Sequence, residues 1–231
     1  MCARKMKSRI LFTFAIVLCA ARTGFAQQTI FNVPSQDVLA PGTVYAELDG
    51  PFRLDMPKYY ALTPRVVVGL GANFEGGINF PGYIDVGDKL WTGIIALKHG
   101  QSLDTTGPWT LTEGAHLYLP FTSGQSVGAF GYAMTGYKLF GFLRLDAGIY
   151  AATNAVTGAG NALGALGSVE LTLTDWLTAA VDGYSGKNAL GYVTPGFFVG
   201  PFGHWIFYPA YEISNTSSDG NAYLLEAGYT F

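Results

Sequence analysis

The chain has 231 residues, of which 31 are glycine, 15% are aromatic and only 13% are charged, whereas soluble domains carry about 25% charged residues. The low charge content argues against a freely soluble surface, and the acidic balance, formally -3, argues against nucleic acid as a partner. Both cysteines, Cys2 and Cys19, lie near the start of the chain, so the remainder has no disulfide, thiolate nucleophile or cysteine metal site.

Residues 1–26 have the three parts of a secretory signal peptide. A basic start, Arg4 to Arg9, precedes an apolar core, Ile10 to Ala21, and a small-residue end. We expect Sec-type export and cleavage after Ala26. Five of the 13 basic residues lie in this segment and none of the 16 acidic ones does, so the remaining chain has a formal charge of -8. Cys19 follows Leu18 rather than a small residue, which disfavours a lipoprotein cleavage site.

Residues 27–41 precede the first periodic segment, and we expect them to form a periplasmic lead-in. Residues 42–231 then form one domain. No stretch of this domain reaches about 18 apolar residues, which excludes transmembrane helices. If the chain enters a membrane it must do so as strands of a closed barrel, because only helices and closed barrels satisfy every backbone polar group there.

Alternation of apolar and polar residues with period two runs through the domain. Between residues 65 and 75, for example, Val66, Val68 and Leu70 share one face while Arg65 and Glu75 lie on the other. One face suits lipid and the other a polar lumen. The same pattern predicts strands near residues 42–54, 64–74, 76–82, 89–98, 109–121, 127–138, 141–152, 161–173, 176–184, 190–199, 203–213 and 221–231.

The predicted fold is all-β: a single antiparallel up-and-down transmembrane β-barrel of about 12 strands, with 10 as the alternative. The count depends on a hairpin that we place at Glu75-Gly76-Gly77, since one long strand there would leave eleven. An even number is expected if both termini are periplasmic. Short connections, such as 139–141 and 174–176, alternate with longer ones, such as 154–160 and 214–220, as at the two rims of outer-membrane barrels.

The polar face supplies the candidate functional residues, because charged side chains inside a membrane barrel set its selectivity. Carboxylates outnumber basic groups among them. The lumen-lining candidates are Glu47, Asp49, Arg65, Glu75, Lys98, His116, Arg144, Asp146, Glu170, Asp182, Glu212 and Glu226.

The end of the chain places Tyr223, Leu225, Tyr229 and Phe231 on one face of the last predicted strand. This ending resembles the C-terminal assembly signal of bacterial outer-membrane β-barrel proteins. The resemblance in pattern covers roughly residues 42–231. It implies location in the bacterial outer membrane, contact with its lipid, and recognition by the barrel-assembly machinery during biogenesis.

Enzymatic chemistry is the weaker expectation. Some outer-membrane barrels hydrolyse lipids, but here the lipid-A deacylase motif His-x-Ser-Asn has no match, since no histidine precedes Ser185-Gly186-Lys187-Asn188. His116 could be paired with Ser102 or Ser185 only arbitrarily. The glycine-rich segments are not followed by helices that could bind phosphate. We therefore predict no catalytic residues, no metal site and no cofactor.

The leading functional hypothesis is a passive channel for small solutes of unknown identity, with a mild cation preference from the excess of carboxylates. It rests on modest lumen charge and on loops without an obvious plug. A closed structural or adhesive barrel is the first alternative, and a lipid-modifying enzyme the second. A soluble β-sandwich would need more surface charge than this sequence supplies.

Overall fold

The computed structural model describes residues 28–54, 58–83, 92–104, 107–216 and 220–231. The predicted signal peptide and its cleavage residue Ala26 lie outside the described residues. The described chain is mostly strand with almost no helix, and its helix α2 (Asn154–Thr157) is a single turn. No helix among these residues is long and apolar enough to cross a membrane.

The described residues form thirteen strands, most of them with the alternating burial expected of a sheet whose two faces meet different environments. They are β1 (Val44–Arg53), β2 (Tyr59–Gly71), β3 (Phe74–Asn79), β4 (Gly82–Tyr83), β5 (Thr92–Ser102), β6 (Trp109–Pro120), β7 (Gly128–Leu139), β8 (Leu143–Ala152), β9 (Leu163–Thr174), β10 (Leu177–Tyr184), β11 (Tyr192–Phe202), β12 (Trp205–Ser214) and β13 (Ala222–Thr230).

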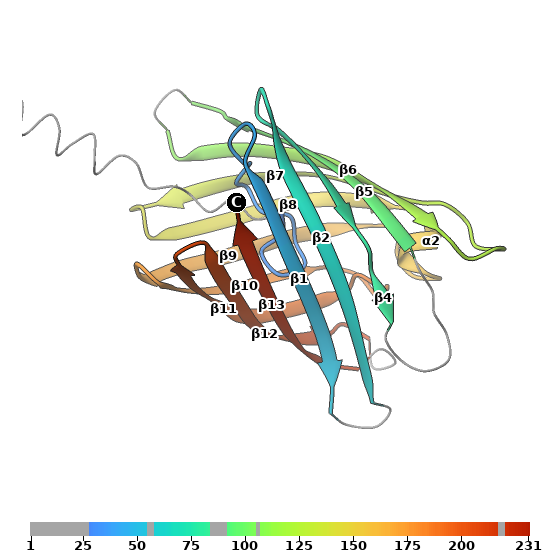
Figure 1. The fold of residues 1–231 in the computed structure, drawn as a ribbon. Helices are drawn as coiled ribbons and strands as arrows, with labels where there is room; N and C mark the ends of the chain where they lie inside the picture. The colour runs from blue at the N-terminus through green and yellow to red at the C-terminus, as the bar shows by residue number, and fades with distance from the viewer. Residues whose placement is uncertain (1–27, 55–57, 84–91, 105–106, 217–219) are drawn as a thin grey trace, which may run out of the picture.

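The strands close into a barrel (Figure 1). Apart from β4, each strand pairs antiparallel with the next one along the chain. Strand β1 pairs with both β2 and β13, which closes the sheet into a barrel. The two-residue β4 continues β3 along β2, because Asn79 pairs with Arg65 and Gly82 with Leu62. Pro81, which has no backbone N–H, lies in the interruption between them. The described barrel therefore has twelve strands, and the predicted fold class and preferred strand number are confirmed.

The hairpin predicted at Glu75-Gly76-Gly77 lies earlier in the chain. The turn is made by Ala72 and Asn73, both with positive φ (49° and 63°), as a two-residue hairpin loop requires. Residues 75–77 instead belong to β3 and pair with residues 67–69 of β2. The predicted position of the turn was therefore wrong. It relied on Gly76 and Gly77, but a pair of glycines is compatible with a strand as well as with a turn.

The two rims differ in the length of their connections. Residues 140–142, 175–176 and 203–204 make short turns on the same rim as the C-terminus, at the left of Figure 1. Residues 121–127, 153–162 and 185–191 make longer connections on the opposite rim, where α2 lies. The connection between β5 and β6, residues 103–108, is an exception, because it is longer than the other connections of the first rim.

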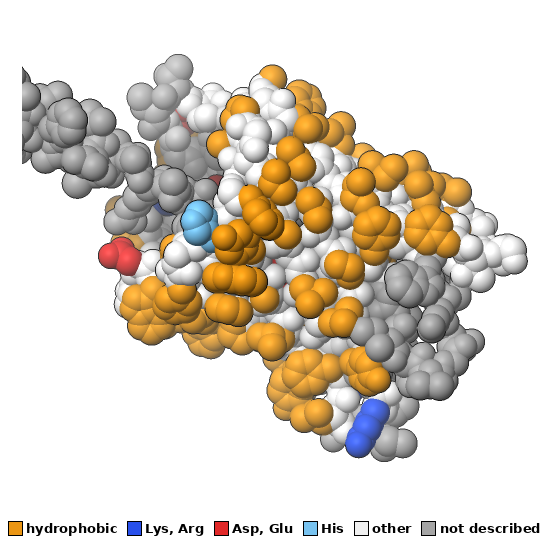
Figure 2. Space-filling model, in the orientation of Figure 1, with side chains coloured by type: hydrophobic (Ala, Val, Ile, Leu, Met, Phe, Trp, Pro, Cys, Tyr) orange, Lys and Arg blue, Asp and Glu red, His pale blue; other side chains and the backbone are white. Residues whose placement is uncertain are grey.

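The outer wall is apolar. Val66, which was predicted to face lipid, is 47% exposed, and Leu97 and Leu171 are 47% and 37% exposed, although all three sit within strands. Figure 2 shows apolar side chains spread over this face, with the charged groups that stand out near its two ends. A surface of this kind is suited to hydrocarbon rather than to water.

Candidate functional site

The segment before β1 lies inside the barrel. Residues 28–41, called the N-terminal segment below, carry Ile30, Phe31 and Val33, each at most 1% exposed. Phe31 packs edge-on against Phe198 of β11, with ring centroids 5.5 Å apart. The range 27–41 was expected to form a periplasmic lead-in. Residues 28–39 are buried or half-buried among the strands, and Ala40 and Pro41 are exposed. The reason for the burial is the short apolar run of this segment, which is buried only when it packs against the inner wall.

Asp182 of β10 holds the first half of this segment. One of its carboxylate oxygens accepts hydrogen bonds from the backbone N–H groups of Phe31, Asn32 and Val33, at 3.0, 2.7 and 2.7 Å. The Asn32 side-chain amide also donates to Thr194 of β11 and Glu212 of β12, both at 3.0 Å. Three adjacent strands therefore bind this turn of the segment through polar or charged side chains.

Arg144 of β8 and, from the wall nearly opposite Asp182, Lys98 of β5 hold the second half. The Arg144 guanidinium donates to both carboxylate oxygens of Asp37, at 2.7 and 2.9 Å. The Lys98 ammonium donates to the Asp37 carbonyl at 2.6 Å and forms a buried ion pair with Glu75 at 2.8 Å. Glu75 in turn accepts the Leu39 N–H at 2.9 Å. The segment thus spans the lumen between opposite walls.

A carboxylate cluster lies where the first and last strands meet. Oxygens of Glu47, Asp49 and Glu226 all lie within 4.8 Å of one another, and the three side chains are buried. Arg65 contacts Asp49 and lies 3.2 Å from Glu47. The spacing of acidic residues along the sequence did not predict this cluster, because Glu226 of β13 is far along the chain from Glu47 and Asp49 of β1. Oxygen ligands of this type could hold a hard cation, but Arg65 already supplies positive charge to two of them.

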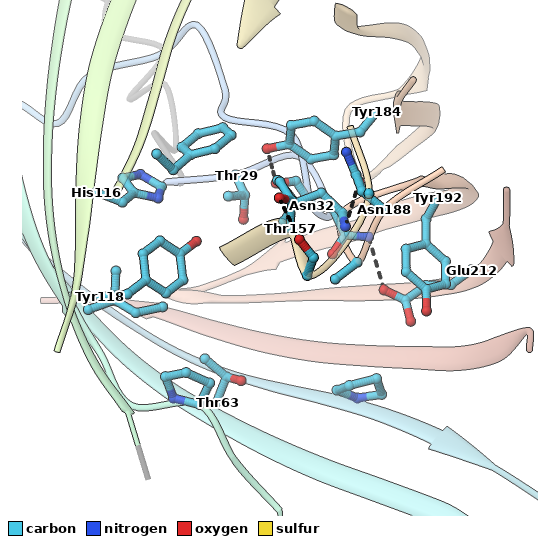
Figure 3. Close-up of a pocket in the computed structure, with 18 of the residues that line it drawn as sticks. Thr29, Asn32, Thr63, His116, Tyr118, Thr157, Tyr184, Asn188, Tyr192 and Glu212 are labelled. Carbon is cyan, nitrogen blue, oxygen red and sulfur yellow. Dashed lines mark hydrogen bonds between the residues drawn. The ribbon is translucent and has the colours of Figure 1, made fainter. Parts of the chain in front are cut away.

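A cavity of about 940 Å³ occupies the lumen on the side of the longer connections. Thr29 and Asn32 of the N-terminal segment belong to its lining. In Figure 3, His116 and Tyr118 stand on one wall, facing Tyr184 and Glu212 across the space. The cavity is therefore bounded by the barrel wall and by the N-terminal segment within it.

The structure places the twelve candidate lumen residues as follows. The buried ones are Glu47, Asp49, Glu75, Lys98, Asp146, Asp182, Glu212 and Glu226, and the half-buried ones are Arg65, His116, Arg144 and Glu170. Glu47, Asp49, Arg65 and Glu226 form one group; Glu75 pairs with Lys98; Arg144 lies 3.7 Å from Glu170. Asp146 accepts a hydrogen bond from Ser168 instead. His116 lies apart, among aromatic rings.

Sequence reasoning missed two kinds of lumen residue. Asn32 and Asp37 contact several strands, but nothing in the pattern of residues 27–41 marks them as interior. Large tyrosines such as Tyr45, Tyr184 and Tyr208 also point inward and are at most 6% exposed. They occupy positions on the face expected to be polar. Their phenolic hydroxyls, which can hydrogen-bond when buried, are the signal that could have identified them.

The histidines do not form a catalytic arrangement with serine among the described residues. His99 Nδ1 lies 3.5 Å from Glu113, and the ring of His204 packs against Tyr229. His116 has Phe130 and Tyr132 as ring neighbours, with centroids 5.3 and 6.1 Å away. The pairing of His116 with Ser102 or Ser185 therefore has no support in these contacts.

The residues of the C-terminal pattern lie on the outer face of β13. Tyr223, Leu225 and Phe231 are 48%, 52% and 71% exposed, and Tyr229 packs against Trp205 of β12 with centroids 4.9 Å apart. Because β13 pairs with β1, this strand closes the barrel.

Comparison with known proteins agrees with this architecture. No protein-family model and no curated protein sequence matches the chain. Among solved structures, the KdgM porin, alone and in complex with disordered oligogalacturonate, matches with a TM-score of 0.60 over 82% of this chain and 99% of that one, at 10% identity. The fold is shared with a porin. The translocator domain of the autotransporter NalP from Neisseria meningitidis also matches, with a TM-score of 0.40, 15% identity, and 98% and 97% of the two chains covered.

Proposed function

We propose that this chain is a bacterial outer-membrane channel for small solutes, narrowed by its own N-terminal segment. The observation that carries the proposal is a closed twelve-stranded barrel with an apolar outer wall and a polar lumen that holds a cavity of about 940 Å³. Membrane barrels of this size lie between small barrels filled by side chains and wide porins. The shared fold with a porin supports the same function.

The N-terminal segment limits what such a channel could pass. Its hydrogen bonds to Asp182 of β10 and to Lys98 of β5, which lies nearly opposite in the barrel, place backbone across the lumen. The loops carry no obvious plug in the sequence, but this segment supplies one. We therefore expect a small conductance, unlike that of an open porin, and a larger one when the segment is released.

Lumen charge favours cations. Among the candidate lumen residues, eight are Asp or Glu and three are Arg or Lys, and Asp37 adds a further carboxylate. Rings of acidic side chains select cations in channels. Oligogalacturonate, which is bound to the KdgM porin in one of the similar structures, is a polyanion and does not suit a lumen of this charge.

A closed structural barrel is the second candidate, and the anchoring of the N-terminal segment is the observation that favours it. Residues 28–41 bond to strands around much of the barrel, which would block passage if the bonds never open. An enzyme is not proposed, because the histidines lack serine partners among the described residues. Export by the Sec route, cleavage after Ala26 and recognition of Phe231 by the barrel-assembly machinery are parts of this proposal.

Single-channel conductance in planar lipid bilayers tests the proposal. Protein extracted from bacterial outer membranes would be compared with the double variant Asp37→Asn/Asp182→Asn, which weakens both anchors, and with Asp175→Asn in the β9–β10 turn as the matched control. We expect small cation-preferring steps for the parent and control, and larger steps for the double variant.

Each other outcome has a defined meaning. Silence of every variant, with heat-modifiable gel migration showing folded barrels, would refute the channel and favour the closed barrel. Conductance only in the double variant would also favour the closed barrel, because its plug would then be permanent in the parent. Anion preference would refute the assignment of selectivity to the lumen carboxylates.

A further inference from the structure

The cavity on the side of the longer connections has the volume and the enclosure of a small-molecule site. Its volume of about 940 Å³ falls within the range of about 300–1,000 Å³ typical of such sites. Thr29 and Asn32 line it from the N-terminal segment, and residues 157–160 and 187–190 line it from the longer connections. A solute entering from that rim would meet this cavity before the segment.

Most charged groups in the lining already interact within the protein. Arg65 is held by Glu47 and Asp49, and Glu212 accepts a hydrogen bond from Asn32 at 3.0 Å. Arg53 donates to the Gly220 carbonyl at 3.4 Å. Lys187 also lines the cavity, but it is exposed to solvent at the rim. A charged ligand deeper in the cavity would have to displace the partners of Arg65, Glu212 or Arg53 or remain without a counter-ion in a partly desolvated space. The cavity therefore favours a neutral ligand.

Neutral polar groups remain available. Asn79, a residue only 6% exposed, belongs to the cavity lining, and its buried side-chain oxygen has no hydrogen-bond partner among the described residues. The Tyr118 hydroxyl points into the same space in Figure 3 and likewise has no protein partner in the described part of the chain. A buried acceptor without a donor is unfavourable, so a ligand hydroxyl near Asn79 would satisfy it.

Aromatic rings complete the lining. The His116 and Phe130 centroids are 5.3 Å apart, and Phe130 lies edge-on to Tyr184 at 6.0 Å. These rings offer apolar faces next to neutral hydroxyl and amide groups. A sugar has the complementary chemistry, because its ring faces carry C–H groups and its edges carry hydroxyls.

We propose that this cavity binds a neutral carbohydrate. The proposal rests on the proposed function, because the carbohydrate would be the class of solute that the channel passes. Tyr118 and Phe130 contact the C–H faces of the sugar, the Tyr118 hydroxyl hydrogen-bonds to one sugar hydroxyl, and Asn79 accepts a hydrogen bond from another. The sugar reaches the cavity from the rim of longer connections and lies against the N-terminal segment.

Isothermal titration calorimetry of the detergent-solubilised protein tests this inference without requiring conduction. The probes are the neutral trisaccharides maltotriose, cellotriose and xylotriose, with trigalacturonate as the charged counterpart of the same length. We expect at least one neutral trimer to bind, and trigalacturonate to bind at least about tenfold more weakly. Tyr118→Leu and Asn79→Leu should each weaken binding about tenfold.

The control is Tyr211→Leu, which removes a tyrosine from the outer face of β12 and should leave the affinity unchanged. Heat-modifiable migration checks that each variant is folded, and Tyr118→Phe, which removes only the hydroxyl, replaces Tyr118→Leu if that variant does not fold. Failure of all neutral trimers to bind, equal binding of trigalacturonate, or unchanged affinity in the Tyr118 and Asn79 variants would overturn the inference. Conduction without sugar binding refutes this inference alone, whereas sugar binding without conduction refutes the channel alone.

Discussion

The Arg144 guanidinium donates two hydrogen bonds, 2.7 and 2.9 Å long, to the two carboxylate oxygens of Asp37, a residue 107 positions earlier in the chain. Such a two-pronged pair fixes orientation as well as distance. It joins β8 to the N-terminal segment and makes residues 28–41 part of the barrel interior. Several measurable properties depend on this docking.

The docking should weaken at low pH. Enclosure in the lumen raises the pKa of Asp37, but the charge of Arg144, helped by Lys98 and Lys138, outweighs it, so the pKa lies below its ordinary value. A carboxylate of this kind stabilises the docked state above its unfolded pKa, about 3.9, and the stabilisation is lost as pH falls through the folded pKa. Hydrogen exchange of the segment's amides, corrected for intrinsic rates, should rise only below about pH 4.

The variant Asp37→Asn is the control for this pH dependence. It removes the titrating carboxylate, so its exchange should be faster at neutral pH and should lack the additional rise below about pH 4. If the segment of the parent protein loosened between about pH 5 and pH 8, a titrating group other than Asp37 would be responsible.

Asp182→Ala should loosen the first half of the segment, because three backbone N–H groups lose their shared acceptor. Hydrogen bonds to charged groups contribute roughly 1.5–3 kcal/mol each, and partial replacement by water leaves a net cost on the order of 2 kcal/mol. Hydrogen exchange at Phe31, Asn32 and Val33 should accelerate about thirtyfold, while Asp175→Ala changes nothing there. Equal protection in both variants would mean that Asp182 does not hold the segment.

Lys98→Met should destabilise the barrel, since Glu75 would keep a buried charge without its partner. The two side chains are 3% and 2% exposed and their charged atoms are 2.8 Å apart. Breaking a buried pair from one side costs about 3–5 kcal/mol, whereas replacing both members costs much less. Urea unfolding in detergent should therefore show a large loss for Lys98→Met and a smaller one for Lys98→Met/Glu75→Gln. A double variant less stable than the single one would contradict this account.

Gly69→Ala should disturb the docked segment where it leaves the lumen. A Cβ at Gly69 would lie 2.0 Å from the Ala40 carbonyl oxygen and 2.7 Å from that of Leu39, both backbone atoms that cannot rotate away. Overpacking of this kind costs about 1–3 kcal/mol. Gly131→Ala is the matched control, because its nearest contact would be an ordinary 3.8 Å. Unfolding midpoints that fall equally in both variants would indicate a general effect of replacing strand glycines.

Leu97→Arg tests whether the outer wall faces lipid. Leu97 is 47% exposed in the middle of β5, and an arginine at the bilayer midplane costs about 2–4 kcal/mol. Phe140→Arg, in a short turn at the rim, should cost only about 0–1 kcal/mol. Unfolding free energies in lipid vesicles provide the comparison, and equal costs at the two positions would place Leu97 outside the membrane.

The amino-acid sequence by itself determined the barrel. Period-two alternation decides which side chains face lipid and which face the lumen, and this local rule is enough to specify a barrel wall. Val66 and Leu70 are exposed as predicted, and the barrel has twelve strands. Turn position was less certain, because a glycine pair suits a strand as well as a turn. The hairpin accordingly lies at Ala72 and Asn73 rather than at residues 75–77.

Only the tertiary structure decided what the lumen contains. The contacts of Asp37 with Arg144 and of Asn32 with Glu212 join residues more than one hundred positions apart, and no periodic pattern records such pairs. Closure of β13 on β1 likewise brings Glu226 to Glu47 and Asp49. Alternation fixes the direction of each inward side chain, but its partner is set by barrel closure and by the path of residues 28–41, which depend on packing across the whole fold.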